Sequence, residues 1–229
     1  MMAGFDEEAN VEPAVSRALA ALEAGFADFE VIVIDDGSRD RTAEVASRLA
    51  ARDPRVRVLR NERNLNYGLS LRRGLAEARC EWVLHEPMDL PLDPEEFTRL
   101  AAAMDGADVV VAVRHDRSAH SPWRKLTSWG NHGLLRLLFR PRTRDLNFVQ
   151  GYRRTWVQGL RVHSTSPAFV TPELILRAER TGRCVREVPA EFLRRERGKA
   201  HFGRPRDILW TLRDMLHLRL RTWLYGWDA

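Results

Sequence analysis

Residues 29–34, Phe-Glu-Val-Ile-Val-Ile, constrain the fold of this chain more than any other segment. Their nearly continuous β-branched character is typical of a parallel strand that helices cover on both faces. The run ends in the turn sequence Asp35-Asp36-Gly37-Ser38, and helical spacing follows over residues 42–51. This part of the chain is therefore predicted to form a buried strand, an acidic turn and a helix.

The same alternation continues along the chain. Further strands are predicted at 56–59, 81–85 and 108–113, and helices at 11–24, at 69–79 and from Asp93-Pro94-Glu95-Glu96, which combines three helix-start signals. Alternating strands and helices imply βαβ units and a doubly wound, mostly parallel α/β sheet. The second half is predicted to hold helices at 122–139 and from Thr171, a strand at 184–188, and a last amphipathic helix at 205–224.

A sheet of this kind normally begins with a strand before its first helix. Only residues 1–6 are left to form this strand before the first helix, and nothing in them looks strand-like. We therefore expect the first strand to be missing or truncated, or the chain to start late. The expected organisation is one α/β domain over residues 1–204 and a C-terminal amphipathic helix over residues 205–229.

The 229 residues, 44% of them hydrophobic, can bury one sizeable core. Their charge is unevenly distributed, since residues 1–113 contain 13 basic and 22 acidic side chains and residues 114–229 contain 24 basic and 10 acidic ones. Every basic side chain except Lys125 and Lys199 is an arginine. This basic half predicts an anionic partner such as phosphate, nucleic acid or a lipid surface. A solvated arginine-rich face is the alternative.

The two cysteines and the apolar runs bear on the compartment. Cys80 and Cys184 are isolated, without a C-x-x-C motif or a histidine at ligand spacing, which indicates a reducing compartment and no zinc site. The longest apolar runs hold about six residues, against the ~20 needed to span a bilayer. We therefore expect no transmembrane helix, and no secretory signal peptide is recognisable.

Acidic residues follow two predicted strands, at the sheet edge where doubly wound proteins bind ligands. Asp35 and Asp36 can accept hydrogen bonds from a base or a ribose, or can serve turn and cap chemistry alone. Neither a G-x-G-x-x-G nor a P-loop motif follows, which argues against a dinucleotide enzyme or a P-loop NTPase. Asp89 and Glu86 are candidate ligands of a hard cation, whereas Asp93 is explained as a helix cap.

Six blocks of sequence, in order, resemble blocks of family 2 glycosyltransferases. The resemblance is greatest to dolichol-phosphate mannose synthases and their bacterial polyprenyl-phosphate relatives, and it covers residues 5–206. The blocks are 7–10; 31–38 with Asp40 and Thr42; 64–68 with Gly74 and Ala78; Asp89-Leu90 with Pro94-Glu95; 106–110 with Arg114; and Arg195 with Gly198-Lys199.

The resemblance implies a GT-A fold, a nucleoside diphosphate sugar donor and Mg²⁺ or Mn²⁺. Asp36, with Asp35 beside it, would contact the base and ribose, and Asp89 would bind the metal and the diphosphate. Arginine suits bidentate phosphate contacts, although a helix-surface role explains Arg124 equally well. The implied residues are Asp89, Arg114 and Arg124 for catalysis; Glu7, Asp35, Asp36, Asn64, Gly68, Ser128, Arg195 and Lys199 for the nucleotide sugar; and Asp89 and Glu86 for the metal.

Three departures from the family pattern are visible. The metal motif of the family is Asp-x-Asp, and here Pro87 stands at the first Asp. Glu86 can substitute for it, arginines can replace part of the metal's charge, or catalysis is impaired. The family's Tyr-Asn-Glu is present only as Phe5-Asp6-Glu7, so part of the nucleotide pocket is expected to be missing, and the usual Ser after the Gly-Lys pair is Ala200.

The resemblance implies inverting transfer of the sugar to a polyprenyl phosphate. A hydroxyl acceptor would need a general base, for which Glu173 is the best spare carboxylate, although a favourable helix-dipole position also explains it. A phosphomonoester, with a second pKa near ~6, is already an anionic nucleophile at pH 7. The alternatives are a family 2 transferase with a hydroxyl acceptor and a degenerate homologue that binds a nucleotide sugar or a partner enzyme.

Residues 194–221 carry nine basic and three acidic side chains beside an apolar side. This combination is typical of a helix in a lipid headgroup layer, and a helix packed on its own domain or on a second copy would show the same stripe. We expect a cytoplasmic protein, peripheral at the inner face of the cell membrane, that binds no nucleic acid. The apolar residues are Leu209, Leu212, Leu216, Leu220, Leu224, Trp210, Trp223 and Trp227.

Overall fold

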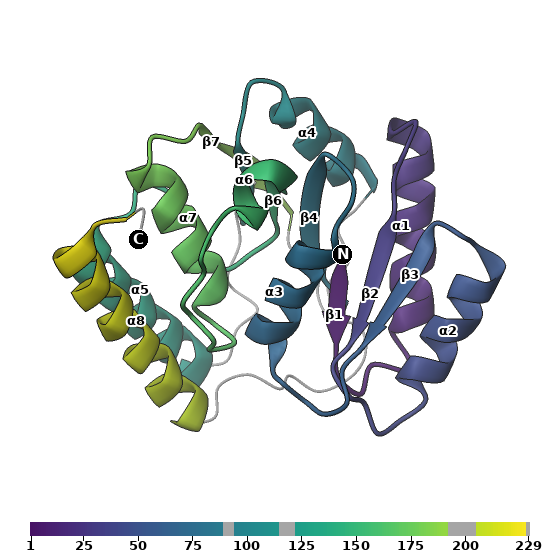
Figure 1. Ribbon diagram of the computed structural model, residues 1–229, viewed down its shortest axis with the longest axis horizontal. Helices are drawn as coiled ribbons and strands as arrows, with labels where there is room; N and C mark the ends of the chain where they lie inside the picture. The colour runs from purple at the N-terminus through teal and green to yellow at the C-terminus, as the bar shows by residue number, and fades with distance from the viewer. Residues whose placement is uncertain (89–93, 115–121, 192–204, 228–229) are drawn as a thin grey trace.

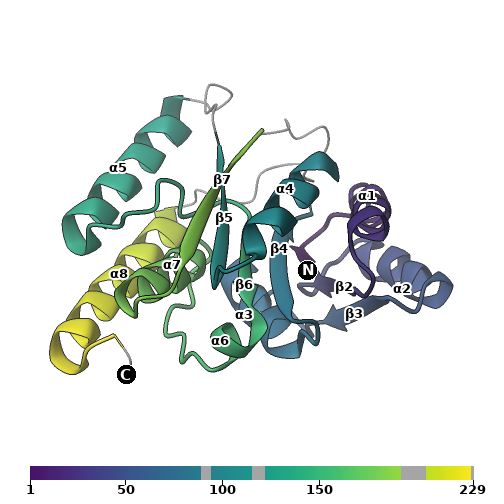
Figure 2. The same cartoon turned by 90° about the horizontal axis from the view of Figure 1, so that it is seen from above.

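The computed structural model describes residues 1–88, 94–114, 122–191 and 205–227, with the backbone alone at 94 and 122–128. A seven-stranded sheet with helices on both faces organises these residues (Figures 1 and 2). Its order is β3-β2-β1-β4-β6-β5-β7, and β6 alone runs antiparallel to its neighbours. The predicted mostly parallel α/β architecture is confirmed, as is the C-terminal helix.

The strands of the sheet are short and alternate with helices along most of the chain. The strands are β1 (Met2–Gly4), β2 (Val31–Asp35), β3 (Val56–Arg60), β4 (Trp82–Pro87), β5 (Val109–Arg114), β6 (Gln150–Arg153) and β7 (Val185–Ala190). The helices are α1 (Val11–Gly25), α2 (Thr42–Arg52), α3 (Tyr67–Glu77), α4 (Pro94–Met104), α5 (Pro122–Phe139), α6 (Arg154–Gln158), α7 (Val170–Arg180) and α8 (Pro205–Tyr225).

The side chains of β2 explain why its sequence is almost continuously apolar. Val31 and Val33 lie in a buried cluster with residues of α1 and α2. Ile32 and Ile34 point to the opposite face and share a cluster with residues of α3, α5, α7 and α8. Successive strand residues alternate between faces, so a strand covered on both sides needs apolar residues at every position.

The structure contains the first strand that the sequence was not expected to provide. Met2–Gly4 forms β1 between β2 and β4, with Met2 paired to Val33 on one side and to Glu86 on the other. The prediction that nothing strand-like precedes α1 is therefore wrong. Its Met-Ala-Gly sequence lacks β-branched residues, but backbone pairing with a neighbour on each side does not depend on side-chain type.

Helix α8 packs one face on the domain and leaves the other exposed. Met215 and Leu218 are buried, and Asp214 Oδ2 accepts hydrogen bonds from the backbone N–H groups of Thr165 and Ser166, both at 2.7 Å. Two tryptophans expected on the outer apolar side lie elsewhere. Trp210 Nε1 donates to Thr165 Oγ1 (3.0 Å), and the ring of Trp227 packs against Phe139. Among the described residues, no helix combines the length and apolar character that a bilayer crossing requires.

His85 is a buried titratable group in β4, between Tyr67 and Tyr152. Its Nδ1 lies 3.1 Å from the Tyr67 hydroxyl, and its Nε2 has no hydrogen-bond partner among the described residues. Burial lowers the pKa of this imidazole to about 3. The folded protein therefore holds His85 neutral.

We expect acid to destabilise the fold through His85. Its pKa in the unfolded chain is about 6.5, so between pH 6.5 and 3 the unfolded chain binds a proton that the folded state excludes. This difference lowers the free energy of unfolding by about 2 kcal/mol from pH 7 to pH 5. Urea unfolding at both pH values should show a smaller acid loss for His85→Gln than for the parent. The exposed His217→Gln is the matched control, and a parent-like acid loss in His85→Gln would contradict the assignment.

Candidate active site

The carboxyl ends of the parallel strands define the candidate site. From β1 the chain passes to β2 and β3 on one side, and it then returns to β4 on the other side of β1. Such a reversal is a topological switch point, and ligands of open α/β sheets bind beside it. Because β5 runs parallel to β4 across the antiparallel β6, Arg114 at the end of β5 lies at the same edge.

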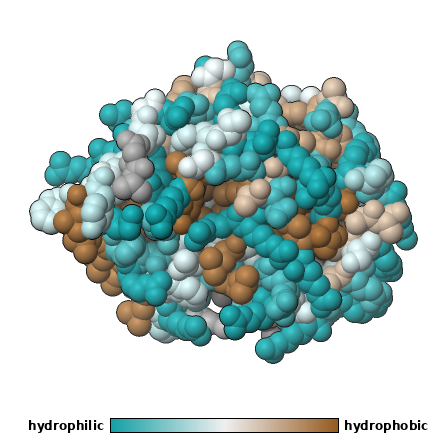
Figure 3. Space-filling view, in the orientation of Figure 1, coloured by the Kyte–Doolittle hydropathy of each residue, from teal (hydrophilic) through white to brown (hydrophobic). Residues whose placement is uncertain are grey.

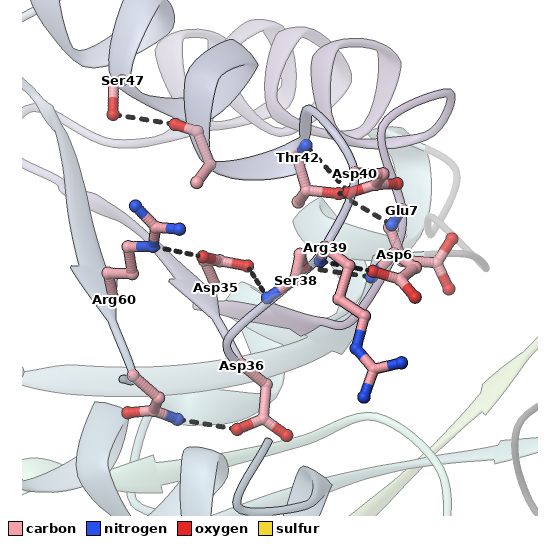
Figure 4. A network of polar contacts seen from close by, with 12 residues as sticks. Asp6, Glu7, Asp35, Asp36, Ser38, Arg39, Asp40, Thr42, Ser47 and Arg60 are labelled. Atoms are coloured by element: carbon pink, nitrogen blue, oxygen red, sulfur yellow. Dashed lines mark hydrogen bonds and ion pairs between the residues drawn. The ribbon is translucent and has the colours of Figure 1, made fainter. Parts of the chain in front are cut away.

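Two acidic loops at this edge are hydrogen-bonded to each other (Figure 4). We call residues 5–10, after β1, and residues 36–41, after β2, the acidic loop pair. Backbone N–H groups of each loop donate to side chains of the other. The bonds are Asp6 N to Ser38 Oγ (3.0 Å), Arg39 N to Asp6 Oδ1 (2.8 Å), Glu8 N to Asp40 Oδ2 (3.1 Å) and Arg41 N to Glu8 Oε2 (3.0 Å).

Glu7, a predicted donor-binding residue, is a buried member of this loop pair. Its backbone N–H donates to Thr42 Oγ1 (2.8 Å), and its carboxylate accepts a hydrogen bond from Asn10. Its carbonyl oxygen accepts from the backbone N–H groups of Asn10 and Val11 at the start of α1. The loop after β1, where we expected part of a nucleotide pocket to be missing, is therefore present and held by hydrogen bonds.

Asp36 is buried, and donors from residues 61–70 surround its carboxylate. Oδ1 accepts from Asn61 Nδ2 (2.7 Å), Ser70 Oγ (2.8 Å) and the Leu65 N–H (2.9 Å), and Oδ2 accepts from the Asn66 N–H (2.9 Å). A carboxylate offers about four acceptor positions, so only Oδ2 retains capacity. Asp36 holds residues 61–70 in place, and the predicted contact with a base or ribose is confined to its one remaining position.

Asp35, at the end of β2, has more spare capacity than Asp36. Its Oδ1 accepts from the Ser38 N–H (3.0 Å). Arg60 Nε lies 3.2 Å from Oδ2, but it does not point along a hydrogen-bond direction, and this oxygen is buried without a hydrogen-bond donor. The Arg60 side chain is largely exposed, so a ligand that displaces it reaches an acceptor oxygen. Because hydrogen-bond strength depends on direction, Arg60 contributes charge to Oδ2 but no hydrogen bond.

Two glycines allow the loops around Asp36 to approach each other. Gly37 has φ +72°, and a Cβ there would lie 2.5 Å from the backbone carbon of Arg63. A Cβ on Gly68 would lie 2.4 Å from the carbonyl oxygen of Ser166. Gly68, predicted to bind the nucleotide sugar, is thus explained by close packing of α3. Asn64, also predicted to bind it, is exposed and accepts the Asn66 N–H (3.1 Å).

Arg114 is held by a carboxylate that the sequence did not single out. Its Nε and Nη2 donate to Asp145 Oδ2 (2.7 Å) and Oδ1 (3.0 Å), and its guanidinium lies 4.9 Å from the centre of the Phe148 ring. Bidentate pairing of this kind fixes the plane of a guanidinium. Arg114 is therefore oriented at the edge of the sheet before any ligand binds.

Two further carboxylates considered from sequence are buried. Glu86 lies within β4 and pairs with Met2 across the ladder, short of the strand end. Glu173 is fully buried, and its oxygens accept from the backbone of His163 (3.1 Å) and Ser164 (2.7 Å) and from Arg177 Nε (2.9 Å). These contacts support a structural role for Glu173 over that of a general base.

The remaining predicted site residues are not all described. Asp89, Arg195 and Lys199 lie outside the described residues, and Arg124 and Ser128 lie in the part of α5 whose side chains are not described. Sequence reasoning missed Asn61, Ser70 and Asp145. None of these three carries a local sequence signal. Asn66 does carry one, because asparagine before a helix is a preferred N-cap, and its Oδ1 accepts from the Gly68 N–H at 2.8 Å.

Comparison with known proteins identifies the family of this chain. Residues 2–161 match the family model described as glycosyl transferase family 2. The chain is 30% identical over 203 residues to an undecaprenyl-phosphate 4-deoxy-4-formamido-L-arabinose transferase of Edwardsiella ictaluri, covering 87% of this chain and 61% of that relative. It is also 30% identical over 232 residues to glycosyltransferase AglD of Haloferax volcanii, covering 97% of this chain and 36% of that protein. The chain belongs to glycosyl transferase family 2.

Solved structures with the same fold bind nucleotides. A glucosyl-3-phosphoglycerate synthase of Mycobacterium tuberculosis in complex with phosphoglyceric acid is 20% identical, with a TM-score of 0.67 over 94% of this chain and 77% of that one. Its complex with Mn²⁺, uridine diphosphate and phosphoglyceric acid is 23% identical, with a TM-score of 0.65 over 96% and 76%. At this identity the likeness concerns the fold, which is of the expected GT-A type.

Gly37→Ala should disrupt the site through the backbone. A non-glycine residue in the left-handed region costs about 1–3 kcal/mol, and the added Cβ would also press on the backbone of Arg63 and Asn64. We expect a lower urea midpoint together with weaker binding of uridine or guanosine diphosphate in titration calorimetry. The matched control is Gly25→Ala at the end of α1, where an added Cβ meets no atom within 4 Å. Equal stability of the two variants would exclude the predicted strain at Gly37.

Proposed function

We propose that this protein transfers a sugar, with inversion, from a nucleoside diphosphate sugar to a polyprenyl phosphate. Family membership and the undecaprenyl-phosphate transferase among its relatives support the reaction class. The chain spans 61% and 36% of the two relatives compared above, so the activity of those whole proteins is carried over only as a proposal. The observation that carries the proposal is the acidic loop pair at the switch point beside β1.

The nucleoside part of the donor would bind between the acidic loop pair and residues 61–66. Asp35 Oδ2 is the buried acceptor available for a base N–H or a ribose hydroxyl once Arg60 moves aside. Asp36 acts as a positioning residue, because its four hydrogen bonds hold residues 61–70 in the required conformation. A buried acceptor without a donor is costly, so a ligand that supplies one gains binding energy.

Magnesium or manganese would be held by Asp89 together with the diphosphate of the donor. Mg²⁺ commonly binds through one or two carboxylates plus substrate phosphates, so it needs no cage made only of protein groups. Among the described residues no cluster of His, Cys, Asp and Glu could hold a metal ion, and the burial of Glu86 within β4 disfavours it as a second ligand. A bound cation would neutralise charge on the leaving diphosphate.

The acceptor would attack without a general base. In the proposed step an acceptor phosphate oxygen bonds to the anomeric carbon, and the bond from that carbon to the diphosphate breaks with its electron pair leaving on the nucleotide. No proton has to move, because the phosphomonoester is already anionic. The burial of Glu173 and its pairing with Arg177 favour this acceptor over a hydroxyl, which would require a base. Arg114, whose charge Asp145 balances, would lie at the same sheet edge as an oriented guanidinium beside the phosphates.

The lipid acceptor would be reached from a membrane surface contacted by α8. The outer face of this helix presents Leu209, Leu216, Leu220 and Trp223, all exposed and spaced to form one stripe, which we call the α8 stripe. Hydrophobic residues gather along the left edge of the molecule, where α8 lies (Figure 3). A helix with such a face and adjacent arginines is suited to the headgroup–acyl boundary of a bilayer. We propose that this contact is made at the inner face of the cell membrane.

Transfer from a panel of GDP- and UDP-sugars to a short-chain polyprenyl phosphate tests the function. The parent chain should form the lipid-linked sugar with one donor, and Asp89→Ala should lower kcat by about 100-fold or more, because charge stabilisation of the leaving group is lost. Asp28→Ala, which removes an exposed carboxylate far from Asp89 in the sequence, should leave kcat unchanged.

Two outcomes would contradict the proposal in different ways. Transfer to a polyprenol or a soluble hydroxyl, with none to the phosphate, would assign a hydroxyl acceptor. Calorimetric binding of GDP or UDP that Mn²⁺ does not strengthen, with no transfer to any acceptor, would assign a degenerate nucleotide-binding homologue.

A further inference from the structure

A cleft of about 490 Å³ lies between the C-terminal ends of α5, α7 and α8. Its lining combines apolar side chains with three arginines, one directly after α5, one at the end of α7 and one within α8. The lining residues are Leu137, Leu138, Phe139, Arg140, Arg180, Arg219 and Trp227. We call this the arginine cleft. It is chemically unlike the candidate active site, where carboxylates predominate.

Two of the three guanidinium groups have no hydrogen-bond or ion-pair partner among the described residues. Arg180 donates to the carbonyl oxygen of Phe139, and its guanidinium lies 5.9 Å from the centre of the Trp227 ring. Within the part of the chain that the structure describes, the guanidinium groups of Arg140 and Arg219 form no hydrogen bond, ion pair or ring contact. Two guanidinium groups that line one cleft without a partner create a positive potential that favours an anionic ligand.

Arg140 also has a strained backbone. Its φ is +50°, the left-handed region, directly after α5 ends at Phe139. Glycine or asparagine commonly ends a helix in this conformation, and other residues incur a cost of roughly 1–2 kcal/mol. The side chain of Arg140 is thus placed at the cleft at the expense of stability, which points to a role for its charge.

The cleft borders the α8 stripe. Arg219 lies three residues after Leu216 and four before Trp223, so all three share one side of α8. Leu216 and Trp223 are exposed, as is Leu137 of α5, which lines the cleft itself. An anion bound by Arg140 and Arg219 would therefore lie beside apolar side chains that project from the protein.

The cleft and the candidate active site lie at opposite edges of the sheet. Arg180 ends α7, and the chain then enters β7 at Val185, which runs parallel to β5. The cleft is consequently near the beginnings of the strands, whereas the acidic loop pair follows their ends. The two sites cannot hold parts of one small ligand.

We propose that the arginine cleft binds the phosphodiester headgroup of an anionic phospholipid whose acyl chains lie along the α8 stripe. A phosphodiester matches the guanidinium groups in charge and hydrogen-bonding geometry, and an attached acyl chain matches the exposed leucines and tryptophan. This lipid is distinct from the acceptor and is not consumed. The inference rests on the membrane contact proposed for α8, and neutral vesicles measure that contact separately.

Co-sedimentation of the full chain with vesicles tests the cleft. Vesicles of phosphatidylcholine alone report on the α8 stripe, and vesicles with about one third phosphatidylglycerol add the anionic headgroup. The parent should bind the anionic vesicles at least tenfold more tightly. Arg140→Gln/Arg219→Gln should lose most of that gain and keep its binding to neutral vesicles. The matched control is Arg136→Gln/Arg206→Gln, which removes two exposed arginines of α5 and α8 that lie outside the cleft.

A second variant separates binding from folding. Arg140→Gly removes the charge and relieves the left-handed strain, so it should raise Tm while weakening binding to anionic vesicles about fivefold. A rise in Tm with parent-like binding would overturn the role assigned to Arg140.

Five further results would overturn the proposal. Equal losses in the cleft pair and the control pair would mean diffuse attraction, and equal binding of the parent to neutral and anionic vesicles would leave only the stripe contact. Binding to neither vesicle would remove the membrane contact as well, without bearing on transfer to a short-chain acceptor. Displacement from anionic vesicles by inorganic phosphate at constant ionic strength would indicate a small-anion site, and a stable dimer in sedimentation analysis would assign the stripe to a second copy.

Discussion

The buried carboxylate of Asp36 is the interaction on which the arrangement around the site depends. An ionised group removed from water is costly unless hydrogen bonds replace its hydration. Asp36 obtains them from Asn61, Leu65, Asn66 and Ser70, which fixes the loop between β3 and α3. Replacing Asp36 would remove the common acceptor of that loop, so its effect should extend beyond any single ligand contact.

The consequences of this carboxylate extend to the C-terminal helix. Asn66, whose N–H donates to Asp36, also caps α3 through the N–H of Gly68. Gly68 packs on the carbonyl of Ser166, and the N–H of Ser166 donates to Asp214 of α8. Contiguous hydrogen bonds and close packing thus join the loop proposed to bind the nucleotide to the helix proposed to contact the membrane.

Local sequence patterns predicted the strands and helices whose own side chains show a clear burial or capping pattern. The apolar run of β2 and the start signals of α4 were sufficient, because burial on both faces and helix capping leave clear traces. β1 was missed because its short Met-Ala-Gly sequence has no β-branched residue, although Met2 is buried and both neighbouring strands pair with it. The antiparallel β6, Gln150–Arg153, was missed because its residues show no strand pattern.

The site was predictable only in part, since its geometry depends on distant partners. The acidic turn at Asp35-Asp36 was recognised, but Asn61 and Ser70 lie 25 and 34 residues from Asp36, and no local pattern links them. Asp145 reaches Arg114 across 31 residues in the same way. Glu86 was chosen for its place after a strand, yet the strand continues through it to Pro87 and buries it.

The antiparallel strand β6 has a consequence for how such proteins can be recombined. It joins β4 through the ladder Trp82–Arg153 to His85–Gln150, where the half of the sheet built from β1 to β4 meets the half that contains β5 and β7. Backbone groups form the ladder, and buried side chains also pack across it, as Tyr152 of β6 does on His85 of β4. A chimaera that exchanged one half for that of a relative would need to keep this short ladder, the glycine at position 68 and the apolar residues of both halves that share one buried cluster.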